Sequence, residues 1–146
     1  MRHALASIFL LSTFAIAAAQ AASPGDTLID QFAKGMNTND AKLAGAAYTP
    51  DAAIIDEFPP HLWHTFGAWQ HDAGASFASE GVTDFHMATG KPTLSRFEAA
   101  QGYAVVPTTL TFEVKGKATV EKGIFTFAFA KTAAGWRISG WAWTTL

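Results

Sequence analysis

The second half of the chain constrains the fold most, because it reads as a series of β-strands joined by short turns. Five strand-like segments there are separated by glycine-containing turns. They span residues 82–87, 93–97, 103–115, 118–131 and 136–144. The turns at Gly116 and Gly135 are too short for a crossover connection, so we expect the last three segments to form an antiparallel meander.

Alternation within these segments predicts which side chains face the core. Phe125, Phe127 and Phe129 share one face, and the small or polar residues between them occupy the other. Trp141 and Trp143 likewise share one face of the last segment. A sheet face this rich in aromatic residues needs a covering layer.

Residues 26–81 supply that layer, because their pattern predicts three helices and one short strand. Apolar residues recur at helical spacing over 26–36, 40–48 and 66–79, and the strand covers 52–58. We expect the second helix to include Tyr48 and to end before Pro50, and Gly81 to close the third. The first two helices then form a hairpin.

The order of these elements indicates one α+β domain with the helices packed on one face of the sheet. A chain of 146 residues is the size of a single domain. A sheet of this length must curve, and curling it around a helical hairpin leaves a cone. The open end of such a cone is a pocket.

The first residues have the three-part layout of a secretory signal peptide. The cationic start Met1-Arg2-His3 precedes an apolar run over 4–19, and small residues follow at 19–22. The run is short for a bilayer span, which needs about 20 residues, although an uncleaved anchor is the alternative. We therefore expect residues 1–21 to be removed and residues 22–146 to form a periplasmic or secreted domain that has no membrane association after cleavage.

Charge and cysteine content exclude several function classes. Removing residues 1–21 takes away one cation, Arg2, and changes the formal net charge from −2 to −3. An acidic domain without a basic patch is not expected to bind nucleic acid. The chain contains no Cys, so its stability must come from the core, to which five Trp, two Tyr and the ten Phe that follow residue 21 can contribute.

Three short segments resemble one superfamily. Residues 48–56 (YTPDAAIID) resemble the helix end and first strand of nuclear-transport-factor-2-like (SnoaL-like) proteins, and 135–143, with GWRI and WAW, resemble their last hairpin. Residues 55–63 (IDEFPPHLW) resemble an exported subgroup. The resemblance implies a cone-shaped α+β fold with three N-terminal helices packed on a curved, mostly antiparallel sheet, and a homodimer formed through the outer sheet face. This fold hosts ketosteroid isomerase, scytalone dehydratase and polyketide cyclases, but also binding and assembly domains.

Asp56 is the first candidate for catalysis. The resemblance places it where ketosteroid isomerase has its general-base aspartate, at the end of the first strand. The donors that stabilise an enolate are absent, since Phe32 and the Phe127–Ala128 region occupy their positions. Steroid isomerisation is therefore not expected. The alternative is a structural acid that accepts backbone N–H groups of the Pro59-Pro60 turn.

His61, His64, His86 and Tyr103 are the other catalytic candidates. A histidine beside Asp56 would form an acid/base pair. The spacing of His61 and His64 matches no tight zinc template, so neither a metal nor another cofactor is expected. The alternation of side chains along residues 82–87 does not decide whether His86 faces the inside of the cone or water. Arg137 is assigned to the surface as a partner of an acid such as Glu113 or Glu121.

Aromatic residues are the candidates for ligand binding. An apolar or aromatic small molecule could lie against a wall of such residues, and the alternative is core or dimer packing. The candidates are Phe32, Phe58, Trp63, Trp69, Trp141 and Trp143. Two function classes stay open: a cofactor-free lyase, isomerase or cyclase, and a non-catalytic ligand-binding or dimeric assembly domain. The sequence contains no nucleophile elbow or phosphate loop.

Overall fold

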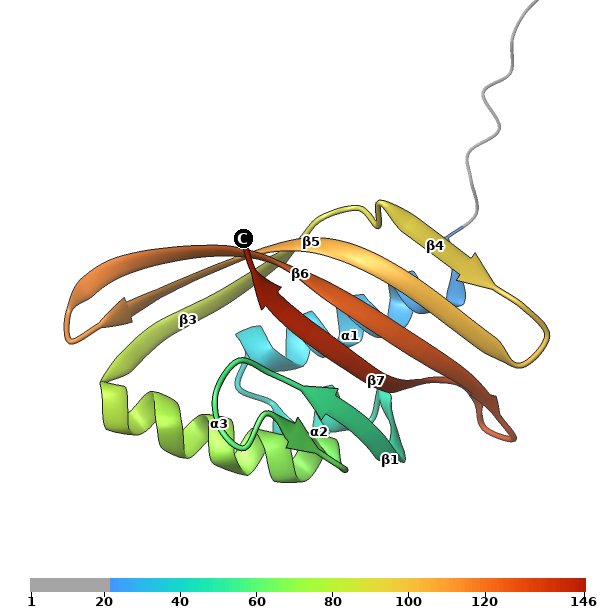
Figure 1. Ribbon diagram of the computed structural model, residues 1–146, viewed down its shortest axis with the longest axis horizontal. Helices are drawn as coiled ribbons and strands as arrows, with labels where there is room; N and C mark the ends of the chain where they lie inside the picture. The colour runs from blue at the N-terminus through green and yellow to red at the C-terminus, as the bar shows by residue number, and fades with distance from the viewer. Residues whose placement is uncertain (1–21) are drawn as a thin grey trace, which may run out of the picture.

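Residues 22–146 are described by a computed structural model, in which they form three helices and seven strands (Figure 1). The predicted signal peptide, residues 1–21, lies outside the described residues. The expected meander is present as β5 (Gln101–Val114), β6 (Lys117–Thr132) and β7 (Gly135–Thr145). Its strands are long and pair antiparallel over most of their length. Figure 1 shows that they curve over α1.

The remaining strands extend the meander at both edges. β1 (Tyr48–Ile55) pairs with β7 and β2 (Leu62–Trp63) pairs with β1, while β3 (Val82–Thr89) and β4 (Leu94–Phe97) both pair with β5. The order across the sheet is β2-β1-β7-β6-β5-β3. All of these pairs are antiparallel except β1 with β7, which is parallel. The sheet is therefore mixed.

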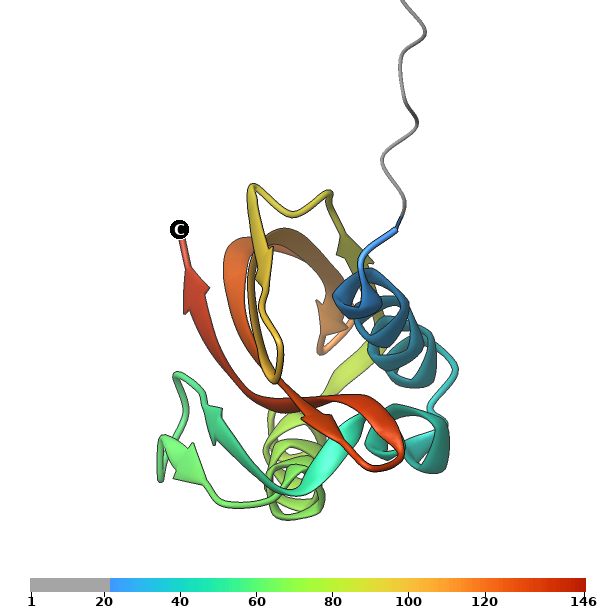
Figure 2. The ribbon, with the colours of Figure 1, turned by 90° about the vertical axis from the view of Figure 1, so that its right-hand side faces the viewer.

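Helix α1 (Pro24–Asn37) packs its apolar stripe against the concave side of the sheet (Figures 1 and 2). It begins two residues before the predicted start, because Ser23 and Asp26 form a capping box and Pro24 occupies the first turn. The Phe32 side chain is fully buried. It makes edge contacts with the rings of Tyr48 and Phe125, at centroid distances of 5.8 and 5.9 Å.

The prediction for the second helix was wrong at its C-terminal end. α2 (Ala41–Gly45) has only five residues, and Tyr48 is the first residue of β1 instead of part of the helix. The Ile138 N–H donates to the Ala47 carbonyl at 2.8 Å, and Tyr48 pairs with Ile138. Pairing with β7, which lies far away in the sequence, thus overrides the local helical pattern.

Helix α3 (Phe66–Glu80) follows β1 and β2, so only α1 and α2 precede the sheet in the chain. Thr65 caps its N-terminus, and Gly81 ends it in a left-handed conformation with φ of 73°. Phe66, Trp69 and Ala73 are its buried residues, all from its first half. No helix within residues 22–146 has the length and apolar character that a membrane span requires.

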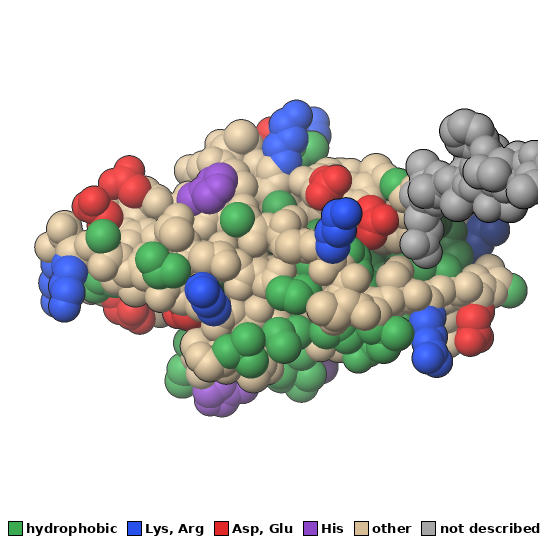
Figure 3. Space-filling model, turned by 90° about the horizontal axis from the view of Figure 1, so that it is seen from above, with side chains coloured by type: hydrophobic (Ala, Val, Ile, Leu, Met, Phe, Trp, Pro, Cys, Tyr) green, Lys and Arg blue, Asp and Glu red, His purple; other side chains and the backbone are tan. Residues whose placement is uncertain are grey.

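The outer face of the sheet is seen in Figure 3. Charged side chains are scattered over it, and apolar side chains gather along the border formed by β7, β1 and β2. Ile55 and Leu62, which are paired across β1 and β2, are exposed there.

Candidate functional site

A cavity of about 280 Å³ lies at the end of the cone, between the sheet, α3 and the segment that follows β1. Its wall is mostly apolar, with Met36, Val82, Met87 and Leu110 beside seven aromatic side chains. The aromatic residues are Phe58, Trp69, Phe77, Phe85, Phe112, Phe125 and Trp143. The polar remainder is Ser76 and four acids, Asp56, Glu57, Glu80 and Glu121.

A second hollow of about 670 Å³ lies between the start of α1 and the β3–β4 connection, and it shares no residue with the first. Its wall includes Ser23, Asp26, Asp30 and Lys91. It is larger but more polar. The cavity that contains Asp56 is therefore the better candidate for a small-molecule site.

Asp56 lies directly after β1, at the point where pairing with β7 ends, and its carboxyl is half-buried in the cavity wall. Its Oδ2 accepts a hydrogen bond from Trp69 Nε1 at 2.8 Å, and its Oδ1 accepts one from the Glu57 N–H at 2.7 Å. Burial raises the pKa of Asp56, and these two hydrogen bonds offset the increase only in part. The negative charges of Glu57 and Glu121 raise the pKa further.

The structure also bears on the alternative role of Asp56 in the turn. The turn is closed by the main chain, since the Asp56 N–H donates to the His61 carbonyl and the His61 N–H donates to the Phe58 carbonyl. The carboxyl receives one backbone N–H, from Glu57, and no other. The side chain is therefore directed to Trp69 and the cavity more than to the turn.

Glu57 and Glu121 are held by the end of β7. Glu57 accepts from the Thr145 N–H and from Thr145 Oγ1, both at 2.7 Å. Glu121 Oε1 lies 3.2 Å from Trp143 Nε1 and 3.2 Å from Thr145 Oγ1. These contacts fix two further carboxylates beside Asp56.

Gly123 allows the Trp143 indole to lie across β6. A Cβ at this position would be 2.4 Å from two atoms of the Trp143 ring, which is closer than real contacts allow. The glycine therefore sets the place of one aromatic wall of the cavity. It also sets the place of the N–H that contacts Glu121.

The histidine candidates do not line the cavity. His61, His64 and His86 are all exposed. His61 Nδ1 lies 3.1 Å from the backbone oxygen of Asp56, so it contacts the main chain and not the carboxyl. A register shift in β3, with Asp84 at a φ of 52°, accompanies the outward position of His86.

Tyr103 lies opposite Arg96 on β4 and is 40% exposed, also outside the cavity. Within the described part of the chain, no histidine side chain or tyrosine hydroxyl therefore meets the Asp56 carboxyl. Phe58, Trp69 and Trp143 do line the cavity.

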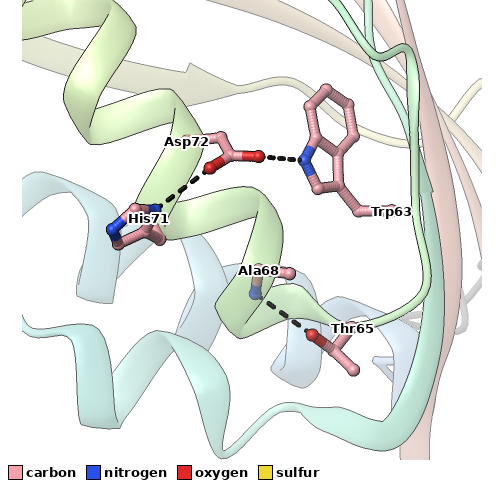
Figure 4. A network of polar contacts seen from close by, with 5 residues as sticks. All are labelled: Trp63, Thr65, Ala68, His71 and Asp72. Atoms are coloured by element: carbon pink, nitrogen blue, oxygen red, sulfur yellow. Dashed lines mark hydrogen bonds and ion pairs between the residues drawn. The ribbon is translucent and has the colours of Figure 1, made fainter.

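Phe32, Trp63 and Trp141 belong to the buried core instead. Trp141 Nε1 donates to the Tyr48 hydroxyl at 2.9 Å, and burial raises the pKa of that tyrosine. Trp63 Nε1 donates to Asp72 Oδ2 at 2.9 Å (Figure 4). Each buried indole N–H thus has its own acceptor.

Asp72 also contacts His71 at 3.0 Å on the exposed side of α3 (Figure 4). Hydrogen bonds from Trp63 and then from His71 lower the pKa of Asp72. This cluster therefore anchors α3 to β2. Within residues 22–146, no three His, Asp or Glu side chains gather as potential metal ligands.

Glu121 is one of several cavity residues that the sequence analysis missed. It was assigned to the surface as a partner of Arg137, but the Arg137 guanidinium donates to the Trp136 carbonyl, and no ion pair joins it to Glu121. Strand periodicity could have identified it, because Glu121 shares its face of β6 with Phe125. An acid on the core face of a strand is the signal.

Comparisons with known proteins agree on the fold. The family model of the SnoaL-like domain matches residues 26–142. A search of curated protein sequences found no match to this chain.

Solved structures with the same fold share little sequence with the chain. A ketosteroid isomerase-like protein from Erwinia carotovora atroseptica is 17% identical over 83% of this chain and 92% of its own, with a TM-score of 0.66. A nuclear transport factor 2-like protein from Salmonella enterica is 14% identical over 82% and 86%, with a TM-score of 0.70. A hexachlorocyclohexane dehydrochlorinase, LinA-type3, from Novosphingobium barchaimii is 10% identical over 81% of each chain, with a TM-score of 0.71.

Proposed function

Because the chain belongs to the SnoaL-like domain family, we propose that it binds a small apolar or aromatic molecule in the cavity beside Asp56. The observation that carries this proposal is the wall itself, in which seven aromatic side chains accompany the half-buried carboxyl of Asp56. Apolar walls supply binding free energy by removing ligand surface from water, and a few polar groups orient the ligand. A volume of about 280 Å³ suits a molecule of one or two rings.

Cofactor-free acid/base chemistry is the second candidate, and it is favoured by the raised pKa of Asp56. A carboxyl with a raised pKa is a stronger base than an ordinary aspartate and can accept a proton near neutral pH. One solved relative of the same fold carries the name of a dehydrochlorinase, an elimination enzyme. In this chain a lyase, isomerase or cyclase step would use Asp56 as a single base, because no histidine of the described residues lines the cavity.

Ligand binding can be tested through the two tryptophans of the wall. Adding tert-butylbenzene, a neutral one-ring probe, should change the fluorescence of the wild type, because Trp69 and Trp143 line the cavity. Trp143→Phe should reduce this response, whereas Trp136→Phe, a substitution outside the cavity, should preserve it. The proposal fails if no small apolar probe binds, or if binding is unaffected by every substitution in the wall.

Catalysis can be tested with the ligand that co-purifies. Native mass spectrometry of the purified protein identifies the bound molecule, and its conversion is then followed with wild type and with Asp56→Asn. Turnover that stops in the variant, while binding persists, supports a base. Binding with no turnover in either protein leaves the chain a binding domain.

We also propose that the domain acts outside the cytoplasm, in the periplasm or after secretion, from the signal-like residues 1–21. Mass spectrometry of the exported protein should find an N-terminus close to Ala22. An intact Met1 in the membrane fraction would contradict this.

A homodimer through the outer sheet face is proposed from the apolar border of that face. Ile55 and Leu62 contribute exposed apolar surface there. Light scattering of the wild type should give twice the mass of the chain. Ile55→Asp should reduce this mass to that of a single chain. A wild-type monomer at high concentration excludes the dimer.

A further inference from the structure

The ionisable groups in the wall of the Asp56 cavity all have the same sign. Asp56, Glu57, Glu80 and Glu121 line it, and among residues 22–146 no Lys, Arg or His does. Within residues 22–146, the one contact within 4 Å between an acid and a basic side chain is that of His71 with Asp72. None of the four acids of the cavity therefore forms an ion pair with a described residue.

The alternation of β6 separates the nearest lysine in the sequence from the cavity. Glu121 faces inward with Phe125, whereas Lys122 points to the outer face and is exposed. The negative character of the cavity thus follows from the strand pattern.

The side-chain donors of the wall are already used. Trp69 Nε1 donates to Asp56, Trp143 Nε1 contacts Glu121, and Ser76 Oγ donates to Glu80. An anionic ligand would meet carboxylates and find no free donor among these groups. Such a ligand is therefore disfavoured twice, by charge and by hydrogen bonding.

The aromatic faces favour the opposite charge. The negative face of an indole or phenyl ring attracts a cation, and Trp is the strongest partner. Trp143 and Phe125 form a corner of the cavity, with ring centroids 4.6 Å apart and planes at 48°. Glu121 lies beside this corner through its contact with Trp143.

We propose that the ligand of this cavity carries a positive charge, as a quaternary or protonated ammonium group on an apolar or aromatic body. This inference rests on the proposed binding function and names its ligand class. A quaternary ammonium is weakly hydrated for an ion, so it enters an aromatic cavity at a smaller cost than a compact cation does. The carboxylates and ring faces then hold the charge, and the apolar walls hold the body.

Three probes of the same shape and different charge test the inference. Phenyltrimethylammonium, tert-butylbenzene and benzenesulfonate each have a phenyl ring and a tetrahedral head, with charges of +1, 0 and −1. Their Kd values are measured at low salt by calorimetry or tryptophan fluorescence. In an apolar cavity without charge the neutral probe binds best, because the ammonium keeps its hydration in water.

We expect phenyltrimethylammonium to bind at least about tenfold more tightly than tert-butylbenzene, and benzenesulfonate to bind most weakly. Glu121→Gln should reduce the preference for the cation several-fold, whereas Glu98→Gln, a matched change on the exposed β4–β5 turn, should not. Salt should weaken binding of the cation and leave that of the neutral probe unchanged.

Two results overturn the inference, and they are distinguishable. If tert-butylbenzene binds as tightly as the ammonium, or Glu121→Gln leaves the ratio unchanged, the ligand class is wrong and the proposed binding function stands. If none of the three probes binds, the binding function fails and the ligand class fails with it.

Discussion

The aromatic core around Phe32 and the cavity beside Asp56 are built from the same kinds of residue on the same face of the same sheet, yet one is filled and the other is hollow. Phe125 belongs to both. In the core, the fully buried Phe32 ring occupies the space above Phe125 and Phe127. In the cavity, no side chain takes that place.

The difference lies in the length of α1. Its first turn reaches Phe97 and Phe129, Phe32 covers the middle of the sheet, and Met36 lines the cavity. The helix then ends at Asn37, whose side chain bonds both main-chain groups of Met87 on β3, at 2.7 and 2.9 Å. Beyond this point α1 no longer covers the sheet, which faces α3 across the cavity. A long sheet over a shorter helix thus leaves room for a ligand.

The comparison predicts that substitution of Phe32, which fills the core, has the largest effect on the free energy of unfolding. Phe32→Ala should lower the free energy of unfolding by about 3–5 kcal/mol, because it opens a hole in a close-packed cluster. Phe112→Ala removes the same ring from the partly exposed cavity wall and should cost less than about 2 kcal/mol. Urea denaturation of both variants measures the contrast. Equal losses would mean that the cavity is as well packed as the core.

A methyl group at Gly123 should introduce steric strain into the wall of the cavity. Gly123→Ala places a Cβ against the Trp143 ring and 2.6 Å from the Thr144 carbonyl oxygen, so the indole and the β7 main chain must shift, at a cost of about 1–3 kcal/mol. Thermal unfolding measures the cost, and weaker binding of the neutral probe reports the displaced wall. Gly74→Ala is the matched control, because a Cβ there meets nothing within 4 Å, and it should stabilise α3 by up to about 1 kcal/mol.

Asp56→Asn, a substitution in the cavity, should change stability in a pH-dependent way, whereas a substitution in the core should not. The folded pKa of Asp56 is raised, so its protonated form is favoured by folding. This contribution to stability is present below the unfolded pKa, near 4, and is lost as pH rises through the folded pKa. The stability of Asp56→Asn relative to wild type should therefore increase from pH 4 to pH 7.

Thermal melts across this range measure the relative stability. Phe32→Ala is the control, since the change in its stability relative to wild type should not depend on pH. A relative stability of Asp56→Asn that falls with pH would show that the carboxylate is stabilised by folding, and would remove the case for a desolvated base.

The smallest effect is expected for the histidines outside both regions. His61→Ala and His86→Ala change exposed side chains and should alter the free energy of unfolding by less than about 0.5 kcal/mol. Binding of the neutral probe should also be unchanged. A loss of binding in either variant would mean that the imidazole reaches the ligand, and would revive the acid/base pair with Asp56.

The sequence by itself determined the elements that depend on local patterns. The meander followed from period-two alternation and short glycine turns, α1 from helical periodicity, and the end of α3 from Gly81. The family segments also placed Asp56 at the end of the first strand, where the structure has it. Each of these signals acts within a few residues.

Only the tertiary structure decided which side chains meet. Tyr48 became a strand residue because β7 offered a hydrogen-bonding partner, and Trp69 was brought to Asp56 from a helix 13 residues away. Strand alternation puts Glu121 on the cavity side of β6, but its contact with Trp143 depends on Gly123, which leaves room for the indole. Local periodicity assigns a side chain to a face, but the distance to residues elsewhere in the chain depends on how helix and sheet lengths match.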